Sequence, residues 1–447
     1  MSLQEKLSEL AAEFAVPGAV VGVVHGDRVD VAVHGVTNVD HPLPVTEETL
    51  FQFGSTGKTF TATALMVLVQ QGLVDLDAPV RTYLPDLALR DEDAAAKVTV
   101  LQLLNHTAGW AGDSIPDTGD GDDCLVRFVA GMVDLDQVSP LGSAVSYNNA
   151  SLVLAGHLIA TVTGQTYEAA VRSLVLEPLG LEHTFGFAKE IMTKRYVSGH
   201  TRSPEGETSI ATPWGLPRAG APAGGWTAAV GDQVAWAQFH LGLTNSDLLT
   251  DDNRLRMQQP TVEMPGNALG DAVGISWLLK EHGGVQLVSH GGTMIGQLSD
   301  FVLVPEHDFG FVCMTNSSPG GAQLYHELRS WALDEYLSVV EAEPVLAELS
   351  PGDLAEFAGT YDTSVAFATI TPRDDVLDVV ITITDLTLMA EGDPAEQPAI
   401  HIGLIDGDGD RYVVTDGEAK GMRGYFFRGD DGAVAGINLG GRDMTRR

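Results

Sequence analysis

The spacing of apolar residues changes several times along the chain and predicts its main elements. Two β-rich runs, residues 19–24 and 29–33, flank a Gly-Asp turn and predict a hairpin near the start of the chain. Residues 59–71 are apolar on nearly every side, which indicates a buried helix rather than a surface helix. Helical spacing then dominates residues 100–243, so a helical region follows the hairpin.

Strand patterns return before residue 340. Four apolar runs, separated by short turns, lie at residues 273–279, 285–288, 298–304 and 310–315. This order is typical of an antiparallel meander, and an amphipathic stretch at residues 322–340 predicts a helix packed on that sheet. Residues 1–340 therefore predict one domain of the α/β (α+β) class, with an antiparallel sheet flanked by helices and a helical subdomain between its strands.

The composition and the spacing of apolar residues change after residue 340. Residues 341–350 are mostly acidic or small and include Pro344, so we expect a linker there. Residues 351–447 contain short alternating strands cut by Asp-Gly turns, which predict a small all-β barrel or sandwich. One turn, residues 406–410, alternates aspartate and glycine like a calcium loop, but Gly417 stands at the twelfth position, so a hairpin turn is expected.

The charge of the chain excludes several classes of partner. Its 61 acidic residues outnumber 25 basic ones and give a formal charge of −36. A field of this sign repels phosphate backbones and anionic lipids, so neither nucleic acid nor a membrane is an expected partner. The sequence contains no apolar run of membrane-spanning length and no signal-peptide pattern at its start, so a cytoplasmic location is expected.

The first candidate for chemistry is Ser55, which precedes Lys58 by three residues at the start of the predicted buried helix. One helical turn places both side chains on the same face. Serine needs a partner that removes its proton at neutral pH, and a desolvated lysine with a lowered pKa can be that base. Taken alone, the pair has a structural alternative, in which Lys58 extends its side chain along an apolar helix toward water.

Five segments, in the expected order, resemble the serine β-lactamase-like and penicillin-binding-protein superfamily, in particular its class C β-lactamase-related esterase and D-aminopeptidase branch. The segments are residues 51–85, 100–110 (with His-Thr-Ala-Gly), 146–149 (Ser-Tyr-Asn-Asn), 222–225 (Pro-Ala-Gly-Gly) and 288–293. Residues 354–361 resemble the first strand of the lipocalin-like β-barrel that follows many of these enzymes. The resemblance implies the fold of that superfamily, with Ser55 as nucleophile and Lys58 as base.

The same resemblance implies roles for three further residues. Tyr147 would lie beside Ser55 and Lys58, share their protons and serve the leaving group. Asn149 would hold the substrate amide and orient Lys58. The backbone N–H groups of Ser55 and Thr293 would form the oxyanion hole.

His290, with Gly291 and Gly292 after it, stands where the superfamily has its Lys-Thr-Gly strand. Members that act on β-lactams or peptidoglycan usually carry a lysine at the first position, a fixed cation for the substrate carboxylate. Histidine is mostly neutral at pH 7, so this need for a carboxylate is weakened. The same substitution is common in the esterase and D-aminopeptidase branches, and we therefore expect esters or amides without a free carboxylate to be bound by these three residues and Asn149.

The leading interpretation is a serine hydrolase that forms an acyl-enzyme on a small ester, an amide or a short peptide, with no cofactor and no metal. One alternative is an acyltransferase or peptide-cyclising thioesterase, which would use the same residues but pass the acyl group to an amine or alcohol. The other is a non-catalytic penicillin-binding receptor that is merely acylated. The sequence also leaves open whether the chain forms a homo-oligomer.

Overall fold

One large antiparallel sheet organises the first three quarters of the protein. The computed structural model describes residues 1–203, 206–363, 365–384, 395–417 and 419–447. Within these residues the sheet has nine strands in the order β2-β1-β14-β13-β11-β10-β9-β8, and β12 pairs with β13 beside this path. The strands are β1 (Gly18–His25), β2 (Arg28–Gly35), β8 (Val262–Asn267), β9 (Gly270–Val273), β10 (Leu278–His282), β11 (Val285–Ser289), β12 (Gly292–Met294), β13 (Gln297–Val304) and β14 (Phe309–Thr315).

The predicted hairpin and meander are confirmed, with one correction. β1 and β2 pair along their whole length, and β13 and β14 form the second long pair. The run at residues 273–279, predicted as one strand, is instead the end of β9, a tight turn and the start of β10. The N–H of Gly274 donates to the carbonyl of Trp277 across that turn, at 2.8 Å, and Ser276 has a φ of 57°. Ile275 and Trp277 are buried within the turn and continue the apolar pattern through it, so hydrophobicity alone did not reveal the turn, although Gly274 and Ser276 are turn-forming residues.

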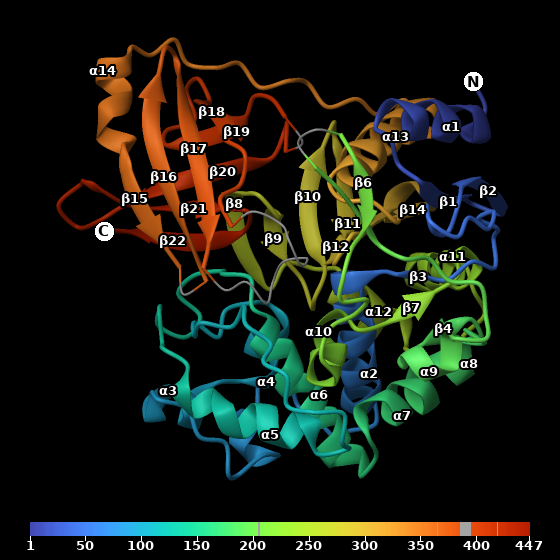
Figure 1. Cartoon of the computed structure of the whole chain (residues 1–447). Helices are drawn as coiled ribbons and strands as arrows, with labels where there is room; N and C mark the ends of the chain where they lie inside the picture. Colours follow the sequence, from blue (N-terminus) through green and yellow to red (C-terminus); the bar gives the residue numbers. More distant parts are fainter. Residues whose placement is uncertain (204–205, 364, 385–394, 418) are drawn as a thin grey trace.

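Helices cover both faces of the sheet (Figure 1). The helices α1 (Leu3–Glu13) and α13 (Gly320–Leu337) share one hydrophobic core with one face. The helix α11 (Val230–Leu241) belongs to the larger core on the other face. Alternate residues of β1 point into the two cores, which explains why seven of its eight positions are buried and why its sequence is almost purely apolar.

The helical subdomain is built around the helix α2 (Lys58–Gln70), which is buried from Lys58 through Leu68. This confirms the buried helix that the sequence predicted. The other helices of this region are α3 (Glu92–Lys97), α4 (Val100–Leu104), α5 (Cys124–Gly131), α6 (Asn149–Thr163), α7 (Tyr167–Val171), α8 (Glu177–Leu179), α9 (Ala188–Ile191), α10 (Ala221–Gly224) and α12 (Asp251–Met257). The described residues also form two small separate sheets, one in the order β3 (Phe51–Gln52), β7 (Thr227–Ala228), β4 (Thr184–Phe185), and one of β5 (His200–Arg202) and β6 (Thr208–Ile210).

The C-terminal part of the chain forms a closed eight-stranded barrel with its own core, within the described residues. The short helix α14 (Pro351–Leu354) precedes it. Its strands are β15 (Gly359–Asp362), β16 (Ala366–Arg373), β17 (Val376–Ile383), β18 (Ile400–Leu404), β19 (Arg411–Val414), β20 (Arg423–Arg428), β21 (Val434–Leu439) and β22 (Arg442–Arg446). The expected turn at residues 406–410 joins the paired strands β18 and β19. The boundaries at residues 340 and 351 remain predictions.

The barrel stands beside β8 and β9, at the end of the sheet farthest from β2 (Figure 1). Glu341 links the two parts, because its carboxylate lies 3.2 Å from Lys280 Nζ on β10 and 2.9 Å from Arg423 Nη2 on β20. Leu346 then pairs with Ile405 of the barrel. Among the described helices, none is both long and apolar enough to cross a membrane.

Candidate active site

A cavity of about 920 Å³ lies between the α/β part and the barrel. Its wall brings together residues that are far apart in sequence, and it holds every predicted site residue except Lys58, which lies directly behind Ser55. The predicted residues in the wall are Ser55, Tyr147, Asn149, His290, Gly291, Gly292 and Thr293. The sequence therefore predicted which residues meet at one place; their chemical roles remain predictions.

Ser55 and Lys58 meet at the start of α2. Ser55 lies in the 3₁₀ turn η1 (Gly54–Gly57), and Lys58 Nζ is 2.9 Å from its Oγ. Lys58 also donates a hydrogen bond to the carbonyl of Ala223 in α10, at 2.7 Å. The side chain is completely buried, so it does not extend into water as the structural alternative required. Burial holds the pKa of Lys58 well below its usual range, and a neutral amine can accept the proton of Ser55.

Backbone contacts between three segments fix the surroundings of Ser55. Gly54 has a φ of +52°, and a Cβ there would lie 2.8 Å from the backbone nitrogen of Thr293 in β12. A Cβ on Gly224 of α10 would lie 3.1 Å from the backbone nitrogen of Ser55. Only glycine fits at these two positions, because a side chain would push the segments apart. The Ser55 and Thr293 backbones are thus neighbours, as an oxyanion hole made from both requires.

Tyr147 lies over the amine of Lys58, whose Nζ is 4.8 Å from the centre of the ring. Burial raises the pKa of Tyr147 above its usual value, although a hydrogen bond with Ser55 acts in the opposite direction. The phenol is therefore protonated at neutral pH and can donate to a leaving group. Its backbone N–H donates to the carbonyl of Gly441, at 3.1 Å, so the barrel helps to hold this residue.

His106 positions the segment that carries Tyr147, and sequence reasoning gave it no role. Its ring packs against the Tyr147 ring, with 4.4 Å between the ring centres. Its Nδ1 accepts from the N–H of Asn148, at 3.2 Å, and its carbonyl accepts from the N–H of Ser146, at 3.1 Å. His106 itself has a φ of 61°, which histidine adopts more readily than most residues. The sequence signal that could have indicated this positioning role was the place of His106 in the His-Thr-Ala-Gly segment.

Asn149 begins α6 and lines the cavity, but the hydrogen bonds of Lys58 among the described residues go to Ser55 and Ala223 and not to Asn149. The preceding residue, Asn148, caps the helix by accepting from the N–H of Ser151, at 2.9 Å. Capping is therefore the function of Asn148, and the roles of Asn149 in substrate binding and in orienting Lys58 stay predictions.

His290 is almost fully buried, with 1% of its surface exposed. Burial, followed by the nearness of the Lys58 amine, lowers the pKa of His290 to about 3, so the ring is neutral near pH 7. Its Nδ1 lies 2.7 Å from the carbonyl of Gly291 and must carry the proton, because a carbonyl only accepts. The position that holds a lysine in β-lactam-directed relatives therefore supplies no positive charge here.

Arg442 and Asp113 form an ion pair in the cavity that sequence reasoning missed. Arg442 Nε on β22 lies 2.7 Å from Asp113 Oδ1, and the guanidinium lies 5.2 Å from the centre of the Tyr147 ring. The charge of Arg442 lowers the pKa of Lys58, and the charge of Asp113 raises it. The two residues are 329 positions apart, and neither belongs to a segment with a recognisable pattern, so no local signal could have paired them.

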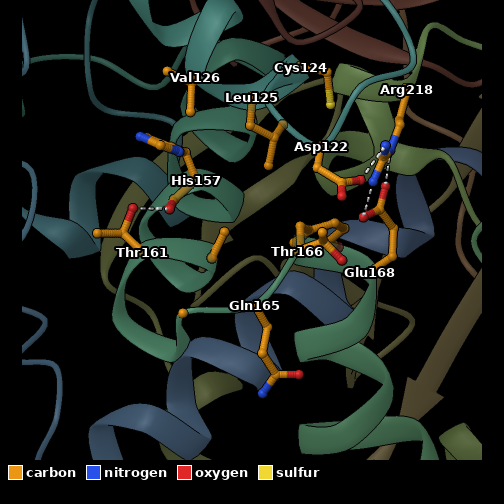
Figure 2. A pocket seen from close by; sticks show the side chains of 13 residues that line it. Asp122, Cys124, Leu125, Val126, His157, Thr161, Gln165, Thr166, Glu168 and Arg218 are labelled. Carbon is orange, nitrogen blue, oxygen red and sulfur yellow. Dashed lines mark hydrogen bonds and ion pairs between the residues drawn. The ribbon is translucent and has the colours of Figure 1, made fainter.

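A second, smaller cavity of about 320 Å³ lies beside α5, α6 and α7 (Figure 2). Glu168 and Arg218 point toward each other there and form an ion pair of 2.9 Å, and Arg218 also reaches Asp122. Burial raises the pKa of the Cys124 thiol, which disfavours a reactive thiolate. This cavity holds no predicted site residue, and the candidate active site is the larger one.

Comparison with known proteins identifies the family. The β-lactamase family model matches residues 3–333, about three quarters of the chain. The chain belongs to the β-lactamase family. Penicillin-binding protein 4 of Amycolatopsis lactamdurans is 32% identical over 373 residues, which cover 80% of this chain and 96% of that protein. This is a family of serine β-lactamase-like and penicillin-binding-protein-like hydrolases.

Two solved structures add to this family assignment. Crystal structures of SurE, alone and with D-Leu, are 27% and 26% identical, have TM-scores of 0.77 and 0.76, and cover 100% of this chain and 98% of SurE. The D-amino acid amidase from Ochrobactrum anthropi SV3, complexed with L-phenylalanine amide, is 25% identical with a TM-score of 0.64. It covers 74% of this chain and 98% of the amidase. The likeness to SurE thus extends over the barrel as well.

Replacing Lys58 with methionine should stabilise the protein and remove its activity. The unfolded chain binds a proton on Lys58 more tightly than the folded protein does, so this residue lowers stability increasingly as the pH falls below its ordinary pKa of 10.5. We expect Lys58→Met to raise Tm in calorimetry, with a larger gain at pH 6 than at pH 9, and to slow acylation about 10²–10⁴-fold. Full activity in this variant would contradict the role of Lys58 as base.

Arg442→Gln and Asp113→Asn should shift the acidic limb of the pH–rate profile for acylation in opposite directions. Loss of the Arg442 charge raises the pKa of Lys58 and moves the limb to higher pH, whereas loss of the Asp113 charge moves it to lower pH. Each shift should be on the order of half a pH unit, since both charges are partly solvated. The double variant should return close to the wild-type profile, and shifts of the same sign in both single variants would refute this electrostatic account.

Proposed function

We propose that this protein is a serine hydrolase that cleaves amides, esters or short peptides through an acyl-enzyme on Ser55. The observation that carries the proposal is the 2.9 Å contact between Ser55 Oγ and the buried amine of Lys58 at the wall of a large cavity. A buried amine with a lowered pKa is a base at neutral pH, and Ser55 is its immediate neighbour. Membership of a family of serine hydrolases supports the same assignment.

The acylation step follows from these contacts. Lys58 Nζ accepts the proton of Ser55 as Oγ forms a bond to the substrate carbonyl carbon. The negative charge that develops on the carbonyl oxygen is stabilised by the N–H groups of Ser55 and Thr293. Tyr147 gives its proton to the leaving nitrogen or oxygen as that bond breaks, and the proton held by Lys58 restores the phenol. Water then attacks the acyl-enzyme, and the acid and a free Ser55 are released.

The substrate class that we propose lacks a free carboxylate near the scissile bond. His290 is neutral, Lys58 has a lowered pKa and Arg442 is paired with Asp113, so the described part of the cavity offers no unpaired cation to an anionic group. Asp117 also lines the cavity and adds a negative charge at its wall. A neutral or cationic substrate suits this distribution better than an anionic one.

We further propose a preference for a D-amino acid residue at the scissile bond. Support comes from two relatives of similar fold: a D-amino acid amidase, and SurE, whose crystal structure with D-Leu matches this chain along its whole length. The stereochemical preference belongs to the proposal and is tested together with it.

Release of nitroaniline or nitrophenol from a small substrate panel tests the proposed function. The panel pairs short acyl nitrophenyl esters with D- and L-aminoacyl nitroanilides, and compares the wild type with Ser55→Ala. We expect turnover that falls by at least about 10³-fold in Ser55→Ala, because the covalent intermediate is lost. D-aminoacyl anilides should be preferred over their L-enantiomers.

The same assay separates the alternatives. New amide products after addition of amine acceptors, without free acid, would identify an acyltransferase instead. A stable adduct on Ser55 with no turnover, seen by intact-protein mass spectrometry, would identify an acylated receptor. Full turnover in Ser55→Ala would contradict the mechanism altogether.

His290→Lys should increase the preference for substrates with a free carboxylate. A lysine at this position restores the cation that β-lactam-directed relatives carry, and a charge-assisted hydrogen bond changes binding about 10–100-fold. We expect the ratio of kcat/KM for a carboxylate-bearing peptide to kcat/KM for its neutral amide to rise by about tenfold in His290→Lys. His290→Gln, which stays neutral, is the matched control. An equal ratio in both variants would show that residue 290 does not set this preference.

A further inference from the structure

The active-site cavity continues from Ser55 into the open end of the barrel. In β17, Leu377 and Val379 point into the barrel core and are fully buried. Ile381 and Ile383 continue the same inward-facing row, because side chains alternate along a strand. Both are only half-buried, and both line the cavity that contains Ser55.

The neighbouring strand β16 shows the same change from buried to half-buried side chains along its inward-facing row. In β16, Ala368 and Ile370 are buried in the barrel core, whereas Ala366, two residues before Ala368 in the same row, is half-buried and lines the cavity. Val365, Leu439 and Met444 complete an apolar wall at this end. Within the described residues, the interior of the barrel therefore opens into the cavity that contains Ser55, and mouths of β-barrels are common places for a ligand to bind.

We propose that this open end of the barrel binds the apolar side chains of an extended peptide substrate whose scissile bond lies at Ser55. The proposal rests on the proposed function of Ser55 and adds the class of substrate. At about 920 Å³ the cavity is near the upper end of the 300–1,000 Å³ that is typical of ligand sites. A single amino acid amide would fill the region around Ser55 and leave the wall at Ile381 and Ile383 uncovered.

A peptide fits this cavity better than a fatty acyl chain because apolar and hydrogen-bonding groups alternate along it. The hydroxyl-bearing residues Thr201, Ser318 and Thr363 line the cavity together with the aliphatic ones. The strand β12 also lines it and pairs, in the described residues, on one side only, with β13. Its other edge offers backbone groups to an extended chain, which is how many peptides are recognised. A hydrocarbon chain would leave these groups without partners.

A series of D-aminoacyl nitroanilides tests the proposal on the full-length protein. The short member carries one residue; two longer members add an N-terminally acetylated extension of two leucines or of two serines. In the wild type we expect the leucine extension to raise kcat/KM about tenfold or more over the short substrate, and the serine extension to have little effect. Equal effects of the two extensions, or a larger gain with a decanoyl extension than with leucine, would overturn the proposal.

Variants in the barrel locate the subsite. Ile381→Asn and Ile383→Asn should remove most of the leucine advantage and leave kcat/KM for the short substrate unchanged, which also shows that the protein is folded. The control is Val380→Asn, since Val380 lies on the same strand and faces away from the interior. It should keep the leucine advantage; loss of that advantage in the control, or its retention in both isoleucine variants, would overturn the assignment to the barrel.

Binding to Ser55→Ala separates this inference from the proposed function. Titration calorimetry with the acetylated leucine-extended peptide amide measures affinity without any chemistry. We expect tighter binding than for the serine-extended peptide by about tenfold, and loss of the difference in Ser55→Ala combined with Ile383→Asn. If no substrate is turned over but this difference is found, the proposed hydrolase function fails and the peptide site stands. If turnover is found but the two peptides bind equally well, the proposed hydrolase function stands and the peptide site fails.

Discussion

The burial of one lysine amine is the constraint on which the rest of the active site depends. An ammonium ion transferred from water to an apolar interior without a counter-charge is strongly disfavoured, and Lys58 has no exposed surface. Burial therefore favours the neutral amine, which has Ser55 Oγ and the Ala223 carbonyl as its neighbours. The helix α2 enforces this state because its first eleven residues are all buried. The burial that lowers the stability of the fold is therefore also what would allow Lys58 to act as the base that we propose.

Close contact between backbones keeps this arrangement rigid. The turn η1, the helix α10 and the strand β12 come together around Ser55 with no room for a side chain at Gly54 or Gly224. Backbone positions vary less than side-chain rotamers, so donors in the backbone can be held at fixed distances from a reacting carbonyl. His106 extends the same principle to Tyr147, since it holds the segment before α6 through both its ring and its carbonyl.

Features that depend on residues close together in the sequence could be predicted from local sequence patterns. The spacing of Ser55 and Lys58 and the apolar run after them were enough to place a buried helix with both side chains on one face, and the structure agrees. The run at residues 273–279 was misread as one strand, because Ile275 and Trp277 are as deeply buried in the turn as they would be in a strand, although Gly274 and Ser276 marked the turn. The contact between Arg442 and Asp113 could not be predicted from the sequence, since it depends on how the barrel packs against the rest of the protein.

The barrel and the residues to which we assign the acylation chemistry belong to different parts of the chain, so the proposed mechanism places catalysis in one part and substrate selection in the other. Every residue to which we assign a step in acylation lies within residues 3–333, the part that matches the β-lactamase family. Arg442, Ile381 and Ile383 lie outside it, yet they reach the same cavity. The charges of Arg442 and Asp113 act on Lys58 with opposite sign, so the pair fastens the barrel near Tyr147 while burial remains the main influence on the base. A barrel attached in this way can change which substrates reach Ser55 and leave the acylation chemistry intact.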